Sequence, residues 1–197
     1  MSLLTSSLPH TVMVDGAEYP INTDFRVSIQ FEQMMFSRGL NEAEALYQAM
    51  RLYYPSFPPD IPKALEQIFW FYQCGKEENR VSRGGMASRS RVYSFEYDAE
   101  YIYAAFLDQY GIDLQDTDLH WWKFQALFHA LKEDNQIVKI MGYRAIQITN
   151  KMSKEQKEFY RSMKKQYAIP VPKSEREKLD SIQSVLLNGG NLSNIQA

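Results

Sequence analysis

The fold class is clearest in the stretch Trp121-Trp122-Lys123-Phe124-Gln125-Ala126-Leu127-Phe128-His129-Ala130-Leu131. Its apolar residues recur at steps of three and four, which is the spacing of one face of an α-helix. Asp116, Thr117 or Asp118 can cap the start of this helix. The adjacent tryptophans lie about 100° apart around a helix, so both are buried only if its apolar face is wide.

The same spacing continues on both sides of this stretch and predicts a mainly α protein of about seven helices. Two starts carry capping-box spacing, because Asn41 stands three residues before Glu44 and Ser153 three before Gln156. The predicted helical segments, with their flanking caps, are 22–37, 42–53, 60–75, 95–110, 116–131, 137–148, 153–167 and 174–187.

The N-terminal region predicts a short β-hairpin ahead of the helices. Thr11-Val12-Met13-Val14 is an apolar run, and Glu18-Tyr19-Pro20-Ile21 follows it after Asp15-Gly16, a pair that favours a two-residue type I′ turn. Because Pro20 has no N–H to donate, the second strand should be short or lie at an edge.

The composition divides the chain into four segments. Residues 1–75 are expected to hold the hairpin and three helices, and residues 95–187 the other helices, sharing one core with the first half. Residues 76–94 contain Gly84-Gly85, four serines and several basic residues without an apolar period. This interval predicts a flexible basic linker or an exposed loop. Residues 188–197 are expected to be a disordered tail.

Composition and charge exclude several classes of protein. The 197 residues are 45% hydrophobic and 14% aromatic, with 22 Lys and Arg against 24 Asp and Glu. A formal net charge of −2 argues against a dedicated nucleic-acid binder. The single cysteine, Cys74, excludes an internal disulfide and a multi-cysteine metal site. No apolar run approaches the roughly 20 residues of a membrane span, and the start lacks a secretory signal, so we expect an intracellular protein.

The residues that carry most enzyme chemistry form no recognisable pattern. His120 and His129 are too far apart in sequence to share a helix face, and the four-residue step from Asp116 to His120 is a common one. Phosphate-binding glycine loops and a G-x-S-x-G nucleophile turn are missing from the sequence. Acidic pairs such as Glu96 and Glu100 stand at helix starts, where capping explains them. We therefore expect no enzyme, no cofactor and no metal.

Two groups of residues are candidates for contacts with a partner. The first is the basic set Arg80, Arg83, Arg89 and Arg91, which suits a phosphate backbone or an acidic protein surface, or is a solvated loop. The second is the pair Trp121 and Trp122, of which one is a candidate anchor for a partner and both are otherwise core residues. The sequence leaves self-association open.

Three segments carry a resemblance to a known family. They are Tyr97-Asp98-Ala99-Glu100-Tyr101-Ile102-Tyr103-Ala104-Ala105-Phe106, Leu119-His120-Trp121-Trp122-Lys123-Phe124 and Met141-Gly142-Tyr143-Arg144. Together they resemble the "gp-fifteen" family of tailed phages and prophages of Gram-positive bacteria, over about residues 10–150. No catalytic residue of that family is carried over to this chain.

The resemblance implies a function in phage tail assembly. Genes of this family usually lie in the tail module, between the major tail protein and the tape measure. This position implies a chaperone that binds the tape-measure protein, or other tail proteins, in the host cytoplasm before the tail tube polymerises. The alternative is a tail completion or connector component that stays in the virion. No membrane and no nucleic acid is expected as a partner.

Overall fold

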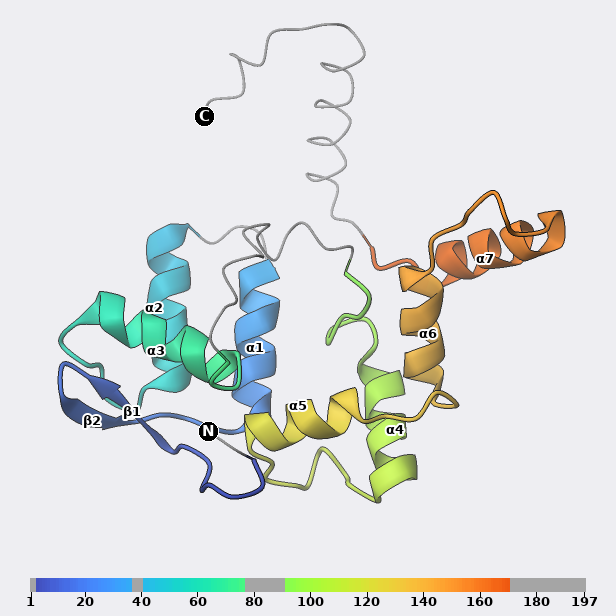
Figure 1. Cartoon of the computed structure of the whole chain (residues 1–197). Coiled ribbons are helices and arrows are strands. Elements are labelled where there is room, and N and C mark those ends of the chain that lie inside the picture. Colours follow the sequence, from blue (N-terminus) through green and yellow to red (C-terminus); the bar gives the residue numbers. More distant parts are fainter. Residues whose placement is uncertain (1–2, 37–40, 77–90, 171–197) are drawn as a thin grey trace, which may run out of the picture.

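The computed structural model describes residues 3–36, 41–76 and 91–170, and these form a mainly α protein with one N-terminal hairpin (Figure 1). The predicted fold class is therefore confirmed. The described elements are β1 (Thr11–Val14), β2 (Ala17–Pro20), α1 (Phe25–Phe36), α2 (Glu42–Tyr53), α3 (Ile61–Tyr72), α4 (Ala99–Tyr110), α5 (Trp121–His129), α6 (Gln136–Ala145) and α7 (Lys154–Gln166).

The hairpin forms where its turn residues predict it. Asp15 and Gly16 both have positive φ, 50° and 77°, as a type I′ turn requires. The antiparallel register pairs Val12 with Tyr19 and Val14 with Ala17. Val12 and Val14 are buried, so alternate residues of β1 attach the hairpin to the helical core.

Both predicted capping boxes are present. Asn41 accepts the Glu44 N–H and Ser153 accepts the Gln156 N–H, while the side chain of each partner returns to the backbone of the cap. Asp60 caps α3 by accepting the Lys63 N–H. These side chains satisfy backbone donors that a helix start leaves without an intrahelical acceptor.

Four predicted helices have wrong boundaries. The helix predicted over 60–75 ends at Tyr72. The helix predicted over 95–110 begins at Ala99, because Ser94 Oγ accepts the Glu96 and Tyr97 N–H groups and forms a turn there. The helix predicted over 116–131 runs from Trp121 to His129, and His120 caps it in place of residues 116–118. The helix predicted over 137–148 ends at Ala145. The segment predicted over 174–187 lies outside the described residues, as does the tail 188–197.

One cluster of buried side chains runs through both halves of the chain, from Val12 on β1 to Ile137 on α6. Phe124 of α5 lies at its centre and stacks on Phe25 of α1 and Phe106 of α4, with ring centroids 4.9 and 5.0 Å away. These contacts place α5 between the N-terminal helices and α4. In the part of the chain that the structure describes, no helix combines the length and the apolar composition that crossing a bilayer requires.

Two tryptophans join α5 to the end of α3. The indole N–H of Trp121 donates to the Tyr72 carbonyl, and that of Trp122 donates to the Phe71 carbonyl, each at 2.8 Å. Carbonyls in the last turn of a helix lack intrahelical donors, so the two indoles complete the C-terminus of α3 from a distant segment. The Trp121 ring also stacks on Tyr72, with centroids 5.4 Å apart.

Gly75 is the residue that lets α3 end against Trp122. Its φ is +67°, and a Cβ built there would lie 2.9 Å from Cη2 of Trp122. A side chain at this position therefore meets both backbone strain and a steric clash. Gly111, at the end of α4, has a similar φ of +65° but open space around its Cβ position.

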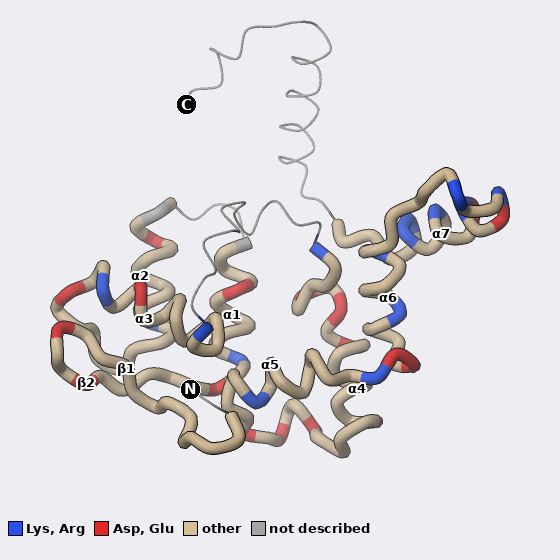
Figure 2. Tube along the Cα trace, viewed as in Figure 1, with Lys and Arg blue, Asp and Glu red and all other residues tan. Residues whose placement is uncertain are grey.

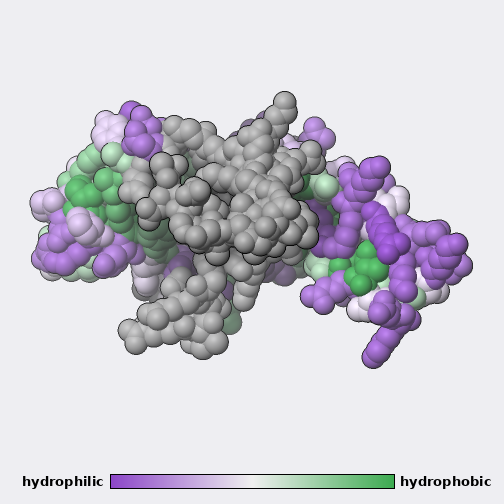
Figure 3. All heavy atoms as spheres, turned by 90° about the horizontal axis from the view of Figure 1, so that it is seen from above, coloured by the Kyte–Doolittle hydropathy of each residue, from purple (hydrophilic) through white to green (hydrophobic). Residues whose placement is uncertain are grey.

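Charged residues and hydrophobic residues are unevenly distributed over the surface. Lys and Arg gather along α7, whereas α4 carries only acidic charged residues (Figure 2). Seen from above, hydrophobic residues gather near α2 and α3, and a smaller area at the α6–α7 end is ringed by hydrophilic ones (Figure 3). The exposed apolar side chains at these two ends are Leu46, Tyr47, Phe57, Phe69 and Phe159.

The pair of glycines provides a test of the α3–α5 junction. We expect Gly111→Ala to lower the free energy of unfolding by about 1–2 kcal/mol, since it adds only left-handed strain. Gly75→Ala should cost about 1–3 kcal/mol more, because its Cβ also displaces Trp122. Urea unfolding of both variants measures the difference. Equal losses would show that Trp122 does not pack against Gly75.

Candidate functional site

The structure describes three of the six predicted contact residues. Arg80, Arg83 and Arg89 lie outside the described residues. Arg91 places Nη2 at 3.5 Å from Oε1 of the buried Glu32, and the adjoining residues 92–94 pack on the core rather than extending into solvent. Trp121 and Trp122 are only 1% and 6% exposed and have the structural role described above. Their role as a partner anchor stays a prediction that this burial does not favour.

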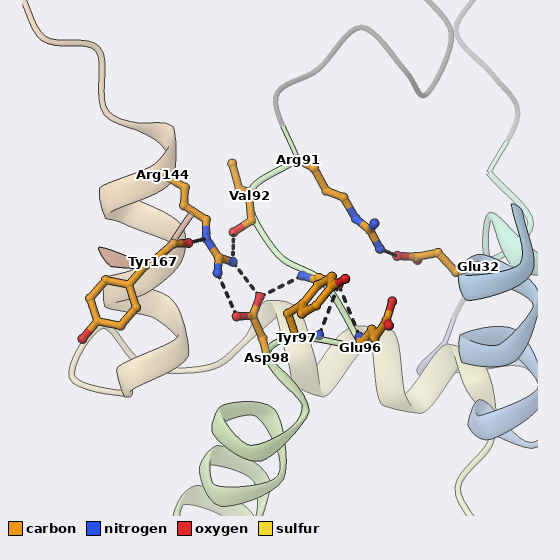
Figure 4. A network of polar contacts seen from close by, with 9 residues as sticks. Glu32, Arg91, Val92, Glu96, Tyr97, Asp98, Arg144 and Tyr167 are labelled. Atoms are coloured by element: carbon orange, nitrogen blue, oxygen red, sulfur yellow. Dashed lines mark hydrogen bonds and ion pairs between the residues drawn. The ribbon is translucent and has the colours of Figure 1, made fainter. Parts of the chain in front are cut away.

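A buried ion pair connects α4 to α6 (Figure 4). Arg144, in the last turn of α6, donates from Nη1 and Nη2 to Oδ2 and Oδ1 of Asp98 at 2.6 and 2.8 Å. The side chains of Asp98 and Arg144 are 2% and 9% exposed. Asp98 also accepts the Ser94 N–H at 2.8 Å. This paired geometry satisfies the carboxylate and the guanidinium together.

Arg144 holds two further segments through its remaining donors. Its Nη1 donates to the Val92 carbonyl at 3.0 Å, and its Nε donates to the Tyr167 carbonyl at 2.6 Å. One side chain therefore joins residues 92–98, α6 and the end of α7. Because its partners occupy four of the five guanidinium N–H groups, the arrangement suits a structural role. Sequence reasoning did not pair Asp98 with Arg144, since nothing in either segment indicates the other as its partner.

Glu32 is a second buried carboxylate, on α1. Its side chain is 4% exposed, accepts the Tyr72 hydroxyl at 2.5 Å and faces Arg91. Burial raises the pKa of Glu32, although the hydrogen bond from Tyr72 and the charge of Arg91 oppose that effect. Burial, with Glu32 nearby, also raises the pKa of Tyr72. The pair links α1 to the same end of α3 that the tryptophans complete.

Cys74 and His120 also lie in surroundings that suit a structural role. Burial raises the pKa of the Cys74 thiol to about 11, so the thiol is protonated at neutral pH. His120 accepts the Trp122 N–H at Nδ1, and its Nε2 lies 3.0 Å from the Pro9 carbonyl. This geometry fits a neutral ring that donates from Nε2, and burial lowers the pKa of His120. Within the described ranges, no three His, Cys, Asp or Glu residues cluster as metal ligands would.

A cleft of about 440 Å³ opens between α1 and α4. Its floor is apolar and its mouth carries the polar side chains Arg26, Glu100, Tyr103 and Gln115. The apolar residues that line it are Phe25, Ile29, Phe95, Ala99, Ile102, Leu114 and Phe124. A cleft of this size with an apolar floor can receive a large apolar side chain from another molecule.

Arg26 fixes the far wall of this cleft. Its Nη2 donates to the carbonyls of Leu114, Gln115 and Thr117 at 2.8, 2.9 and 3.1 Å. Its Nη1 pairs with Asp24, which also accepts the Arg26 N–H at the start of α1. These hydrogen bonds from Arg26 therefore fix the loop after α4 beside α1. Sequence reasoning missed this cleft, because its residues come from four separate parts of the chain.

Comparison with known proteins gives one match. The family model described as "Bacteriophage Gp15 protein" matches residues 4–169, a range that includes both strands and α1 to α7. No curated protein and no solved structure matches the chain.

The buried ion pair predicts a large loss of stability when one partner is removed. Arg144→Ala should lower the free energy of unfolding by about 3–5 kcal/mol, since it leaves Asp98 charged and buried. Lys139→Ala, at an exposed position of α6 itself, is the matched control and should change it by less than about 0.5 kcal/mol. Chemical denaturation measures both variants. Similar small effects would mean that Asp98 is solvated and needs no partner.

The lowered pKa of His120 predicts a stability that falls in mild acid. Below pH 6.5, the ordinary pKa of histidine, the unfolded chain binds a proton at this position before the folded chain does. The stability that the neutral ring contributes is therefore present above pH 6.5 and lost as the pH falls through the folded pKa. His120→Asn keeps a helix cap without titrating. Its free energy of unfolding should fall less between pH 7 and pH 5 than that of the wild type, and parallel curves would contradict this.

Proposed function

The chain belongs to the bacteriophage Gp15 protein family, and from that premise we propose that it is a tail assembly chaperone that binds the tape-measure protein. In this proposal it acts in the host cytoplasm, before the tail tube polymerises around the tape measure. Family membership carries the proposal, because it limits the chain to a phage protein. The tape-measure partner and a Gram-positive host stay predictions.

The α1–α4 cleft supports a role in covering apolar surface. Its lining comes from α1, α4 with the preceding Phe95, Phe124 of α5, and a loop that Arg26 holds in place, so the cleft exists without a partner. An amphipathic helix binds such a cleft through apolar residues spaced three or four apart. A long helical partner offers many equivalent residues of that kind, so one protein can bind at successive turns of it.

Reversibility favours a cleft of modest size. A chaperone must leave the tape measure when tube subunits arrive, so each contact has to be weak enough to exchange. A cleft of about 440 Å³ receives one or two side chains rather than a whole helix. Many weak contacts along one partner then supply the total affinity.

The direct test is co-expression with a tape-measure fragment. We expect a soluble complex in the presence of this protein and precipitation of the fragment alone. Binding should survive moderate salt, because the cleft floor is apolar. Equal insolubility with and without the protein, and no recovered complex at low salt, would reject the chaperone function.

Two variants on α4 localise the contact. Ala99→Glu places a carboxylate at the cleft mouth, where the first turn of α4 tolerates an acidic residue, so folding should be retained while binding is weakened about tenfold or more. Ala104→Glu is the matched control, because Ala104 is an exposed residue of the same helix outside the cleft. Calorimetry with the fragment compares them, and equal affinities would place the contact elsewhere.

The alternative is a completion or connector component that remains in the virion. Quantitative mass spectrometry of purified virions separates the two functions. A chaperone should be missing from the virion, or present in far fewer copies than one ring of subunits needs. Recovery in ring numbers would support the structural component instead.

A further inference from the structure

The outer face of α4 is acidic, aromatic and exposed. We use this name for Ala104 and the residues three and four positions before and after it on the helix, namely Glu100, Tyr101, Leu107 and Asp108. All five are exposed to solvent, and Tyr101 and Leu107 are 38% and 44% exposed. The face therefore combines carboxylates with apolar surface that no described part of the chain covers.

The stretch of sequence that holds this face contains no positive side chain. Arg26 of α1 lines the cleft with Glu100, but Asp24 and three carbonyls occupy its guanidinium. Residues 92–122 include no Lys or Arg. Among the ion pairs of the described residues, only Asp98 in this interval has a partner, the buried Arg144. The acidic residues of the interval are Glu96, Asp98, Glu100, Asp108, Asp113, Asp116 and Asp118. Such a surface attracts a basic partner.

A complementary basic stripe lies on α7 of the same chain. It consists of Lys154, Lys157, Arg161 and Lys165, which recur at steps of three and four along one side of the helix. None of the four takes part in an ion pair within the described residues. α7 itself has no buried residue and lies against α6 at the edge of the molecule (Figures 1 and 2). The stripe is thus available to another surface.

The two surfaces are similar in length and complementary in chemistry. The stripe runs from Lys154 to Lys165, about 16 Å of helix, and the outer face of α4 runs from Glu100 to Asp108, about 12 Å. Lysine and arginine can pair with Glu100 and Asp108, and a guanidinium can lie over the ring of Tyr101. The aliphatic stems of these basic side chains can cover Leu107 and Ala104.

We propose that the basic stripe of α7 in one copy docks on the outer face of α4 in a second copy. Within one chain the two surfaces form no described ion pair, so the complement of each comes from another molecule. Because the two surfaces differ, the contact is head to tail. It builds a closed ring if the rotation from one copy to the next returns to the first copy, and an open array if it does not. This association goes beyond the proposed function and needs no tape-measure protein.

The test is the oligomeric state of the full chain alone, measured by sedimentation velocity over a range of concentrations. We expect oligomers at about 50 mM salt that dissociate at about 500 mM, where charges are screened beyond a few ångströms. Two double variants should each be monomeric at low salt: Arg161→Glu with Lys165→Glu on α7, and Tyr101→Lys with Asp108→Lys on α4. Neither α4 position lines the cleft, so the co-expression result is independent of this one.

Mixing the variants provides the decisive observation. Each double variant retains the surface that the other has lost, so an equimolar mixture should recover association. Lys132→Glu with Lys151→Glu makes the same change in net charge as the α7 variant, at exposed positions outside α4 and α7, and should associate like the wild type. A monomeric wild type at low salt, or variants that fail to complement each other, would overturn the proposal. Loss of tape-measure binding by the α4 variant, with a monomeric wild type, would assign that face to the tape measure instead.

Discussion

The two indole hydrogen bonds at the end of α3 are the constraint on which the rest of the structure depends. Trp121 and Trp122 donate to the carbonyls of Tyr72 and Phe71. These two residues end α3, the last of the three N-terminal helices. The bonds fix the position of α5, and through Phe124 they also place α4 against α1. Adjacent tryptophans can both be buried here because both find acceptors in one helix end, and Trp122 packs beside a glycine, Gly75. Phe124 also lines the α1–α4 cleft, which connects the cleft to this junction.

The ion pair between Asp98 and Arg144 connects the C-terminal helices α6 and α7 to this core. It joins residues that belong to two of the segments resembling the phage family, so the resemblance coincides with a physical contact between them. The same arginine holds the end of α7 through the Tyr167 carbonyl. The cleft and the basic stripe of α7 are therefore carried on one connected framework. Partner binding at one surface and self-association at the other can then occur on the same folded chain.

Local signals predicted the elements better than the contacts between them. The hairpin turn at Asp15-Gly16 and the capping boxes at Asn41 and Ser153 depend on neighbouring residues, and all three were predicted correctly. The start of α5 was not. His120 caps it by accepting the Trp122 N–H, while its other ring nitrogen contacts the carbonyl of Pro9, a residue far away in sequence. The tryptophan contacts, the Asp98–Arg144 pair and the cleft equally depend on segments brought together by folding. Periodicity carries no information on such pairings.

The central claim is that this phage protein binds a helical partner in the cleft between α1 and α4. Hydrogen–deuterium exchange on the complex with a tape-measure fragment tests it most directly, because it locates the contact without altering the chain. The account predicts added protection at residues 25–29, 99–103 and 114–115, which line the cleft. Residues 121–122 should change little, since they are already buried. Protection confined to other segments, or no change on mixing, would contradict it.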